Sequence, residues 1–258
     1  MKVVILAGGL GTRISEESKS KPKPMIEIGH MPILWHIMKS YSHYGYNEFI
    51  ICAGYKQRMI KEWFYNYFLD CSDVKFNYKN GKNDFTILNS HIEPWEVSVI
   101  DTGYGTLTGG RVKRIEKYVK DETFMLTYGD GVCDVNINEL VKFHKSHGKI
   151  ATITAVVQKQ QKGILDIGEY GIVKSFREKK NNDNASINAG FMVLEPGIFK
   201  YLKDDNTILE TEPMEKLADD NELMSFNHNG FWQCMDSLRE KDLLEDMWNR
   251  GNAPWKVW

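Results

Sequence analysis

The chain has 258 residues with 33 basic and 35 acidic side chains, and its net charge of −2 argues against nucleic acid or an anionic membrane surface as the main partner. The four cysteines lie far apart without a C-x-x-C pair, a pattern typical of a reduced cytoplasmic protein and not of a disulfide framework or a zinc site. The N-terminus shows no signal-peptide pattern, and no apolar run approaches the roughly 18 residues of a membrane span, so we expect a cytoplasmic protein without a membrane partner.

Strand and helix patterns alternate along the first half of the chain. An apolar strand pattern over Lys2–Leu6 is followed by a helical pattern over Ile33–Tyr44, a strand over Glu48–Cys52 and a helical pattern over Met59–Phe68. This alternation is typical of βαβ units and a parallel sheet. The later predicted elements are strands at 74–78, 85–88 and 97–100, a helix at 108–118, a strand at 123–127, a helix at 138–147, strands at 151–156, 172–176 and 187–194, and helices at 196–202, 210–221 and 238–249.

No internal repeat and no Pro/Gly/Ser-rich linker divides the chain. We therefore expect one α/β domain over residues 1–258, with a Rossmann-like, mostly parallel mixed sheet flanked by helices. The terminal APWKVW carries two tryptophans, a pattern that favours docking against the same or a neighbouring subunit.

The loop after the first strand is rich in glycine and reads LAGGLGTR over Leu6–Arg13. A dinucleotide fingerprint would need a third glycine at the position of Ile14, and no register of the loop supplies the Gly-Lys-Ser/Thr of a P-loop. Glycines at positions 8, 9 and 11 nevertheless let backbone N–H groups approach an anion closely. The loop alone fits a phosphate cradle and a tight strand-to-helix turn about equally well.

Two cationic side chains near this loop favour the phosphate interpretation. Arg13 supplies a planar guanidinium that suits phosphate oxygens, and Lys23 supplies a point charge. Lys23 lies between Pro22 and Pro24, so a stiff backbone segment aims its side chain. Together with the glycines they predict a triphosphate site.

Asp130 follows a predicted strand, within the sequence YGDG. In open α/β sheets, ligands bind outside the carboxyl ends of the parallel strands, so Asp130 is expected beside the glycine-rich loop. An aspartate between two glycines is also a common turn former. Asp236, which precedes Ser237, has the pattern of a helix cap as its alternative interpretation.

LAGGLGTR with KPKPM resembles the signature of the nucleotidyltransferases that join a sugar 1-phosphate to a nucleoside triphosphate. The resemblance covers nearly the whole chain, and the later segments are similar to the glucose-1-phosphate cytidylyltransferase branch: PILWHIMKSY, FIICAGY, EPW, TGGR, TYGDG, LDI, FREK, INAGFMVLEP and FWQCMDSLREK. It implies a fold of the nucleotide-diphospho-sugar transferase type and Mg²⁺-dependent transfer of CMP from CTP to a sugar 1-phosphate. α-D-Glucose 1-phosphate is the expected acceptor and CDP-glucose and pyrophosphate are the products. It further implies a homo-oligomer, trimer or hexamer, that serves deoxysugar or O-antigen polysaccharide biosynthesis.

The resemblance also assigns roles to individual residues. Arg13, Lys23 and Asp130 are the implied catalytic residues, and Asp130 and Asp236 are the implied Mg²⁺ ligands. Thr106 and Arg111 are expected at the cytidine part of the nucleotide. The whole implied nucleotide site is Leu6, Ala7, Gly8, Gly9, Leu10, Gly11, Thr12, Arg13, Lys23, Thr106, Arg111 and Asp130, and the implied sugar-phosphate site is Glu178, Lys179 and Asn188.

Three departures from the family pattern leave the acceptor open. Lys180 stands where proline is usual, Ala189 stands where glycine is usual, and the loop at 157–163 lacks the expected Arg-Phe-Gly. A different phosphorylated acceptor or nucleotide, or a catalytically inactive binding subunit, are therefore the alternatives. Retention of all four charged site residues favours an active enzyme, and the missing third glycine argues against an NAD-dependent oxidoreductase.

Overall fold

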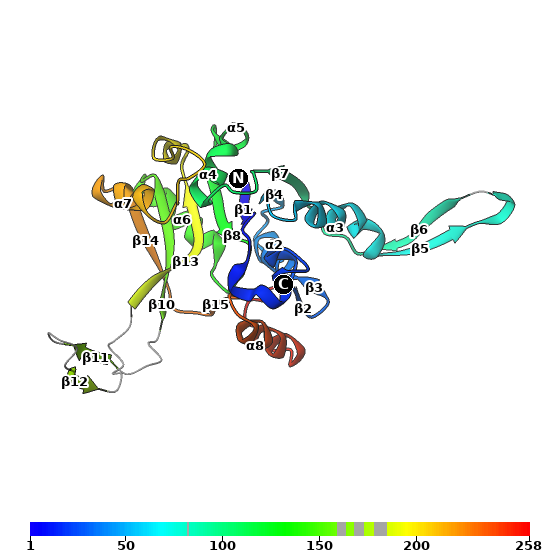
Figure 1. The fold of residues 1–258 in the computed structure, drawn as a ribbon. Helices are drawn as coiled ribbons and strands as arrows, with labels where there is room; N and C mark the ends of the chain where they lie inside the picture. Colours follow the sequence, from blue (N-terminus) through cyan, green and yellow to red (C-terminus); the bar gives the residue numbers. More distant parts are fainter. Residues whose placement is uncertain (82, 159–163, 168–172, 178–184) are drawn as a thin grey trace.

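A seven-stranded mixed sheet forms the centre of the molecule (Figure 1). The computed structural model describes residues 1–81, 83–158, 164–167, 173–177 and 185–258. The strands lie in the order β14-β10-β13-β8-β1-β4-β7, and β13 runs antiparallel to both of its neighbours while the other adjacent pairs are parallel. The predicted Rossmann-like, mostly parallel mixed sheet is therefore confirmed.

The strands of the central sheet are β1 (Val3–Ala7), β4 (Glu48–Ala53), β7 (Glu96–Asp101), β8 (Phe124–Tyr128), β10 (Ala151–Gln158), β13 (Ala185–Leu194) and β14 (Leu223–His228). Four two-stranded pairs lie outside it: β2 (Glu27–Ile28) with β3 (Met31–Pro32), β5 (Ser72–Asn77) with β6 (Asp84–Ser90), β9 (Gly131–Cys133) with β15 (Trp232–Cys234), and β11 (Ile164–Ile167) with β12 (Val173–Arg177). The helices are α1 (Ser15–Ser18), α2 (Ile33–His43), α3 (Gln57–Asp70), α4 (Thr108–Arg114), α5 (Glu116–Val119), α6 (Ile137–His147), α7 (Glu212–Asp219) and α8 (Leu238–Asn249), with single 3₁₀ turns at Thr12–Ile14, Lys23–Met25, Lys79–Gly81 and Pro196–Lys200.

Helices cover both faces of the sheet, and β1 shows why. All five residues of its sequence VVILA are buried, as expected for a strand of a parallel sheet with both faces covered. Its alternate residues belong to two different hydrophobic clusters. One cluster packs α2, α6, α8 and the C-terminal tail against the sheet, and the other packs α4, α5, α7 and the Pro196–Lys200 turn. Trp255 of the tail is fully buried, so the tail docks on its own chain.

Two of the predicted helices differ from the observed ones. The predicted helix at 108–118 is divided at Ile115, whose φ and ψ of −98° and 5° lie outside the α region, so α4 and α5 are separate. The predicted helix at 196–202 is a 3₁₀ turn, because the amides of Ile198 and Tyr201 bond three residues back, to Glu195 and Ile198.

The β5–β6 hairpin extends away from the sheet beyond α3 (Figure 1). It carries exposed apolar side chains, namely Phe76, Tyr78, Phe85 and Leu88. Among the helices in the described ranges, none has both the length and the apolar character needed to cross a bilayer.

Candidate active site

The glycine-rich loop and Asp130 lie at the carboxyl ends of two adjacent parallel strands. β1 pairs with β8 so that Leu6 lies opposite Tyr128, and the amide of Gly129 donates to the carbonyl of Leu6 at 3.0 Å. The two loops that follow these strands therefore start side by side. This is the position that the strand pattern predicted for both of them.

A short strand pair brings Asp236 to the same place. β9 and β15 are antiparallel with Gly131 opposite Cys234, and the amide of Met235 donates to the carbonyl of Asp130 at 2.8 Å. Residues that lie more than a hundred positions apart in the sequence thus become neighbours. Each strand has only three residues, so no periodicity in the sequence could have revealed this pairing.

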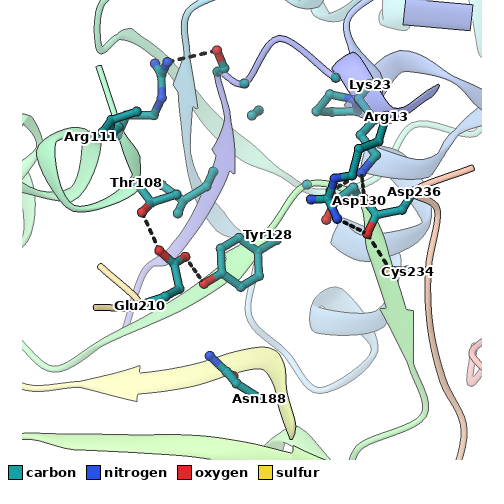
Figure 2. Close-up of a pocket in the computed structure, with 18 of the residues that line it drawn as sticks. Arg13, Lys23, Thr108, Arg111, Tyr128, Asp130, Asn188, Glu210, Cys234 and Asp236 are labelled. Carbon is teal, nitrogen blue, oxygen red and sulfur yellow. Dashed lines mark hydrogen bonds and ion pairs between the residues drawn. The ribbon is translucent and has the colours of Figure 1, made fainter. Parts of the chain in front are cut away.

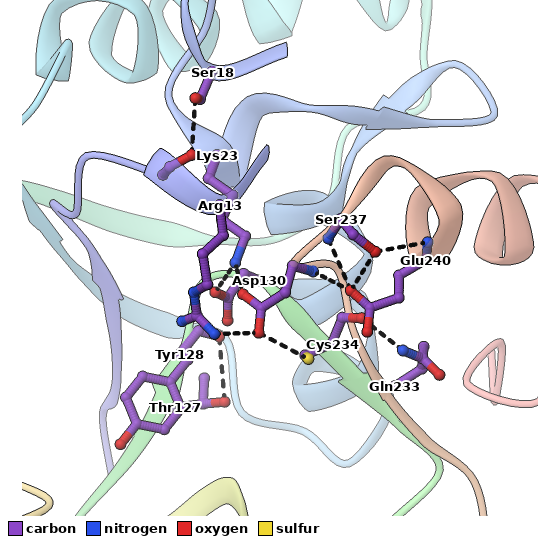
Figure 3. Close-up of polar contacts among 12 residues, drawn as sticks. Arg13, Ser18, Lys23, Thr127, Tyr128, Asp130, Gln233, Cys234, Ser237 and Glu240 are labelled. Atoms are coloured by element: carbon purple, nitrogen blue, oxygen red, sulfur yellow. Dashed lines mark hydrogen bonds and ion pairs between the residues drawn. The ribbon is translucent and has the colours of Figure 1, made fainter. Parts of the chain in front are cut away.

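Arg13, Lys23, Asp130 and Asp236 form a charged cluster at this point (Figure 2, Figure 3). Lys23 Nζ lies 2.5 Å from Asp130 Oδ2 and 2.5 Å from Asp236 Oδ1, so one ammonium group bridges both carboxylates. Arg13 Nη1 lies 2.7 Å from the other oxygen of Asp236. The Lys23 side chain is only 9% exposed, whereas that of Arg13 is 75% exposed.

The charges of this cluster stabilise one another. Burial alone lowers the pKa of Lys23, but the charges and hydrogen bonds of Asp130 and Asp236 outweigh it, so the pKa lies above its ordinary value. Burial likewise raises the pKa of Asp236, and the contacts with Lys23, the Cys234 thiol and Arg13 reverse that effect. Both groups are therefore ionised at neutral pH.

The structure assigns the cap of α8 to Ser237 and not to Asp236. The Ser237 hydroxyl accepts from the amide of Glu240 at 3.4 Å, and Glu240 Oε2 accepts from the amide of Ser237 at 2.8 Å, which is a capping box. The same carboxylate oxygen also accepts from the amide of Asp236 at 2.7 Å. The Asp236 side chain is therefore left for the charged cluster, and the helix-cap interpretation of Asp236 is wrong.

Cys234 Sγ lies 3.4 Å from Asp236 Oδ2, to which the thiol donates. Burial and the neighbouring carboxylates of Asp236 and Glu240 raise the pKa of Cys234 to about 12, so the group is a protonated thiol at neutral pH. It orients the carboxylate and adds no charge to the cluster.

Arg111 holds the glycine-rich loop in place through its guanidinium group. Its buried guanidinium donates to the carbonyls of Gly8 at 2.9 Å and Gly103 at 2.7 Å, and to the Thr102 hydroxyl at 2.8 Å. A Cβ on Gly8 would lie 2.1 Å from Arg111 Nη1, so this close approach requires glycine. These donors are taken by protein oxygens here, and the predicted contact of Arg111 with cytidine stays a prediction.

The charged cluster opens into a cavity of about 810 Å³, a size that suits a nucleotide together with a second small ligand (Figure 2). Its lining contains most of the predicted site residues, namely Leu6, Ala7, Gly8, Gly9, Gly11, Thr12, Arg13, Lys23, Thr106, Arg111, Asp130, Asn188 and Asp236. Leu10 is exposed and is not part of the lining. Glu178, Lys179 and Lys180 lie outside the described residues.

One wall of the cavity was not predicted from the sequence. Glu210 accepts a hydrogen bond from Thr108 Oγ1 at 2.6 Å and a second one from the Tyr128 hydroxyl (Figure 2). Burial, and then the Glu210 carboxylate, raise the pKa of Tyr128, so its hydroxyl stays protonated. The one signal for this wall in the sequence is the position of Tyr128 directly before GDG, at the end of a predicted strand.

The charged cluster is also the place where a divalent metal fits. Mg²⁺ prefers one or two carboxylates, with water and phosphate oxygens completing its shell. Asp130 and Asp236 converge on a single cation, the ammonium of Lys23, and they face a cavity that has room for phosphate oxygens. Their chemistry and convergence match this donor set.

Comparisons with known proteins give the relatives of this chain. The family model described as nucleotidyl transferase matches residues 2–236. A glucose-1-phosphate cytidylyltransferase of Salmonella typhi is 54% identical over 259 residues, covering 100% of both chains. A probable glucose-1-phosphate cytidylyltransferase of Bacillus subtilis is 44% identical with the same coverage.

Solved structures share the fold at low sequence identity. The crystal structure of HddC from Yersinia pseudotuberculosis superimposes with a TM-score of 0.68 at 23% identity, covering 96% of this chain and 99% of that one. The inositol-1-phosphate CTP transferase from T. maritima gives a TM-score of 0.67 at 14% identity, covering 100% of this chain and 97% of that one. The expected nucleotide-diphospho-sugar transferase type of fold is confirmed.

Proposed function

The chain belongs to the nucleotidyl transferase family, and we propose that it transfers CMP from CTP to a sugar 1-phosphate, with α-D-glucose 1-phosphate as the expected acceptor. The Salmonella and Bacillus relatives bear the name glucose-1-phosphate cytidylyltransferase, which supports CTP and glucose 1-phosphate as substrates. The observation that carries the proposal is the convergence of Lys23, Asp130 and Asp236 beside a glycine-rich loop. A cluster of this kind suits charge that builds up on phosphoryl oxygens.

The reaction needs positioning more than proton transfer. An oxygen of the sugar phosphate attacks the α-phosphorus of CTP, a new P–O bond forms, and the bond from that phosphorus to the β-phosphate oxygen breaks to release pyrophosphate. The attacking phosphate is already an anion at neutral pH, so no general base is required. Backbone N–H groups of the loop at Gly8–Gly11 bind phosphate oxygens, while Lys23 and Arg13 offset the negative charge of the transition state.

We propose Mg²⁺ as the metal of this site, held by Asp130 and Asp236. When bound, it screens the phosphate charges and orients the triphosphate. Lys23 contacts both of these carboxylates, which keeps its ammonium beside the reacting phosphoryl group. Glu240 and Cys234 fix the backbone and one oxygen of Asp236, and so limit the movement of this ligand.

The proposal also covers the oligomeric state and the cellular compartment of the protein. The apolar side chains on the β5–β6 hairpin support a homo-oligomer, because a monomer rarely keeps such side chains in water. The family resemblance implies that this oligomer is a trimer or a hexamer. The four cysteines are all free thiols, which supports a reducing, cytoplasmic compartment. Sedimentation velocity tests the oligomer, and a single monomeric species at micromolar concentration would contradict it.

Pyrophosphate release tests the proposed reaction. The purified protein is assayed with Mg²⁺ against CTP, UTP, dTTP, GTP and ATP, each combined with a panel of sugar 1-phosphates. We expect CTP with glucose 1-phosphate to give the highest kcat/KM. A different best pair would correct the nucleotide or the acceptor, and no release with any pair would support the inactive binding subunit.

A further inference from the structure

Glu210 lines the cavity at a distance from the charged cluster. It precedes α7, and Figure 2 shows it on the opposite side of Tyr128 from Asp130 and Asp236. Among the described residues of the lining, these three carry the carboxylates. The two aspartates pair with Lys23, whereas the partners of Glu210 within the described chain are hydroxyl groups. Its negative charge is therefore not neutralised by a neighbouring cation there.

Two hydroxyl groups hold this carboxylate in a fixed orientation. Thr108 Oγ1 accepts from the amide of Leu209 at 2.9 Å, so its own proton points to Glu210 Oε2 at 2.6 Å. The Tyr128 hydroxyl donates to the other oxygen. A carboxylate has about four lone-pair positions, so each oxygen keeps the capacity to accept a further hydrogen bond. Glu210 thus presents a rigid set of acceptors.

The part of the cavity beside Glu210 offers a hydrogen-bond donor and aromatic rings, which complement the acceptors of Glu210. Asn188 Oδ1 accepts from the amide of Gly190 at 2.8 Å, which leaves the side-chain NH₂ directed at the cavity (Figure 2). Gly190 has φ of +82°, and a Cβ there would lie 2.3 Å from the Tyr128 ring, so glycine allows the ring to pack against β13. Trp232 Nε1, from β15, donates to the carbonyl of Ala189 in β13 at 2.8 Å, which holds a second aromatic ring against β13.

Such a wall suits a polyhydroxylated, uncharged group. A fixed carboxylate repels phosphate oxygens but accepts hydrogen bonds from hydroxyls, and the Asn188 amide donates to hydroxyl oxygens. Glu210, Asn188 and Trp232 all belong to the part of the chain that follows β8. In Figure 2, Arg111 lies farther from Asn188 than Glu210 does, and its guanidinium donates to the carbonyl of Gly8, on the side expected for the nucleotide.

We propose that Glu210 is a specificity-determining residue that accepts hydrogen bonds from hydroxyl groups of the acceptor sugar. The inference rests on the proposed function, because it requires a sugar 1-phosphate as the second substrate. It assigns a substrate contact to a residue outside the predicted site. Tyr128 and Thr108 are positioning residues, because their hydroxyl groups hold the Glu210 carboxylate in place.

The test compares Glu210→Gln with the wild-type enzyme on the best sugar 1-phosphate of the pyrophosphate panel and on its monodeoxy analogues. Glutamine keeps the shape but replaces one accepting oxygen by a donor. We expect kcat/KM for the sugar phosphate to fall about 10- to 100-fold, while the KM for CTP and the CTP/UTP preference stay unchanged. Glu212→Gln is the matched control, because Glu212 lies two residues away and pairs with the exposed Lys203 and Lys216.

The deoxy analogues identify the contact. An analogue that lacks the hydroxyl bound by Glu210 should lose activity with the wild type, but should lose little more with Glu210→Gln, because that interaction is already absent. An equal further loss for every analogue would overturn the proposal, as would an unchanged kcat/KM. A changed CTP/UTP ratio would place Glu210 at the base and would also overturn it.

Two further measurements keep the outcome unambiguous. If Glu210→Gln does not fold, Glu210→Asp serves in its place, because it keeps the charge and withdraws the carboxylate by one methylene; an unchanged kcat/KM for the sugar phosphate would again overturn the proposal. The wild-type panel is measured first. Failure of the wild type on every pair would refute the proposed function, whereas an active wild type with an equally active Glu210→Gln would refute only the assignment of Glu210.

Discussion

Two buried bases differ in charge at neutral pH. Lys23 in the charged cluster is positively charged, whereas His36 beneath the C-terminal tail is neutral. Lys23 lies 2.5 Å from an oxygen of each of two carboxylates, and its pKa is raised although burial alone would lower it. His36 packs among aromatic rings, with Trp35 and Trp248 at centroid distances of 5.1 and 4.6 Å. Burial lowers the pKa of His36 to about 4. A counter-charge within reach, and not the degree of burial, decides whether a buried base stays charged.

The hydrogen bonds of His36 agree with a neutral ring. Nε2 lies 2.9 Å from the carbonyl of Ile28, which can only accept, so this nitrogen carries the proton. Trp255 Nε1 donates to Nδ1 at 3.4 Å, which makes that nitrogen the acceptor. Both nitrogens are thus used by a neutral imidazole that ties the tail to α2. The proposed function assigns chemistry to the charged cluster, whereas the hydrogen bonds of His36 serve docking of the tail.

The largest effect is expected from removing the cation of the charged cluster. Lys23→Met should lower kcat by roughly 10³-fold while it changes the CTP dissociation constant little, because the ammonium stabilises mainly the charge that develops in the transition state. Steady-state kinetics with calorimetric CTP binding measures both quantities. Lys21→Met is the control, since Lys21 pairs only with Glu27 among the described residues. Weaker CTP binding at unchanged kcat would contradict this role.

A smaller effect is expected at His36, as a dependence of stability on acid. Its pKa of about 4 in the folded state lies below the ordinary 6.5, so its contribution to stability is complete above pH 6.5 and is lost as the pH falls toward 4. The loss attributable to His36 is about 3 kcal/mol. Urea unfolding at pH 7, 5.5 and 4 should show a shallower decline for His36→Gln than for the wild type or for the exposed control His30→Gln. Parallel declines for all three proteins would contradict the neutral, buried imidazole.

The smallest effect is expected at the helix cap beside the charged cluster. Ser237→Ala removes the hydroxyl that accepts from the amide of Glu240, and should lower the free energy of unfolding by about 1 kcal/mol. The Mg²⁺ requirement should not change, because the Asp236 carboxylate keeps its contacts with Lys23 and Arg13. Thermal unfolding and a Mg²⁺ titration separate the two roles. A changed Mg²⁺ requirement at unchanged stability would refute this division between cap and cluster.

Local patterns in the sequence predicted the part of the site that lies near the strand ends. The glycine-rich loop and Asp130 follow buried strands, so the rule for open sheets places them together. Asp236 was assigned only through resemblance, because two three-residue strands bring it to Asp130. The wall at Glu210 depends on contacts with Thr108 and Tyr128 across 102 and 82 positions of the sequence, and no periodic pattern encodes such contacts. The helix break at Ile115 is a backbone feature that apolar spacing does not reveal.

A Mg²⁺ titration of Asp236→Asn tests most directly whether the charged cluster is the metal-dependent reaction centre. Replacing an anionic ligand by an amide removes charge and keeps shape. The Mg²⁺ concentration for half-maximal activity should therefore rise at least roughly tenfold, because losing even a residue that only hydrogen-bonds to a metal ligand weakens metal binding by about this factor. Asp130→Asn should also raise this Mg²⁺ concentration. The free-energy cost to activity in the double variant should be smaller than the sum of the costs in the two single variants, because both residues act on one ion. An unshifted titration with normal turnover in Asp236→Asn would contradict a shared metal at this site.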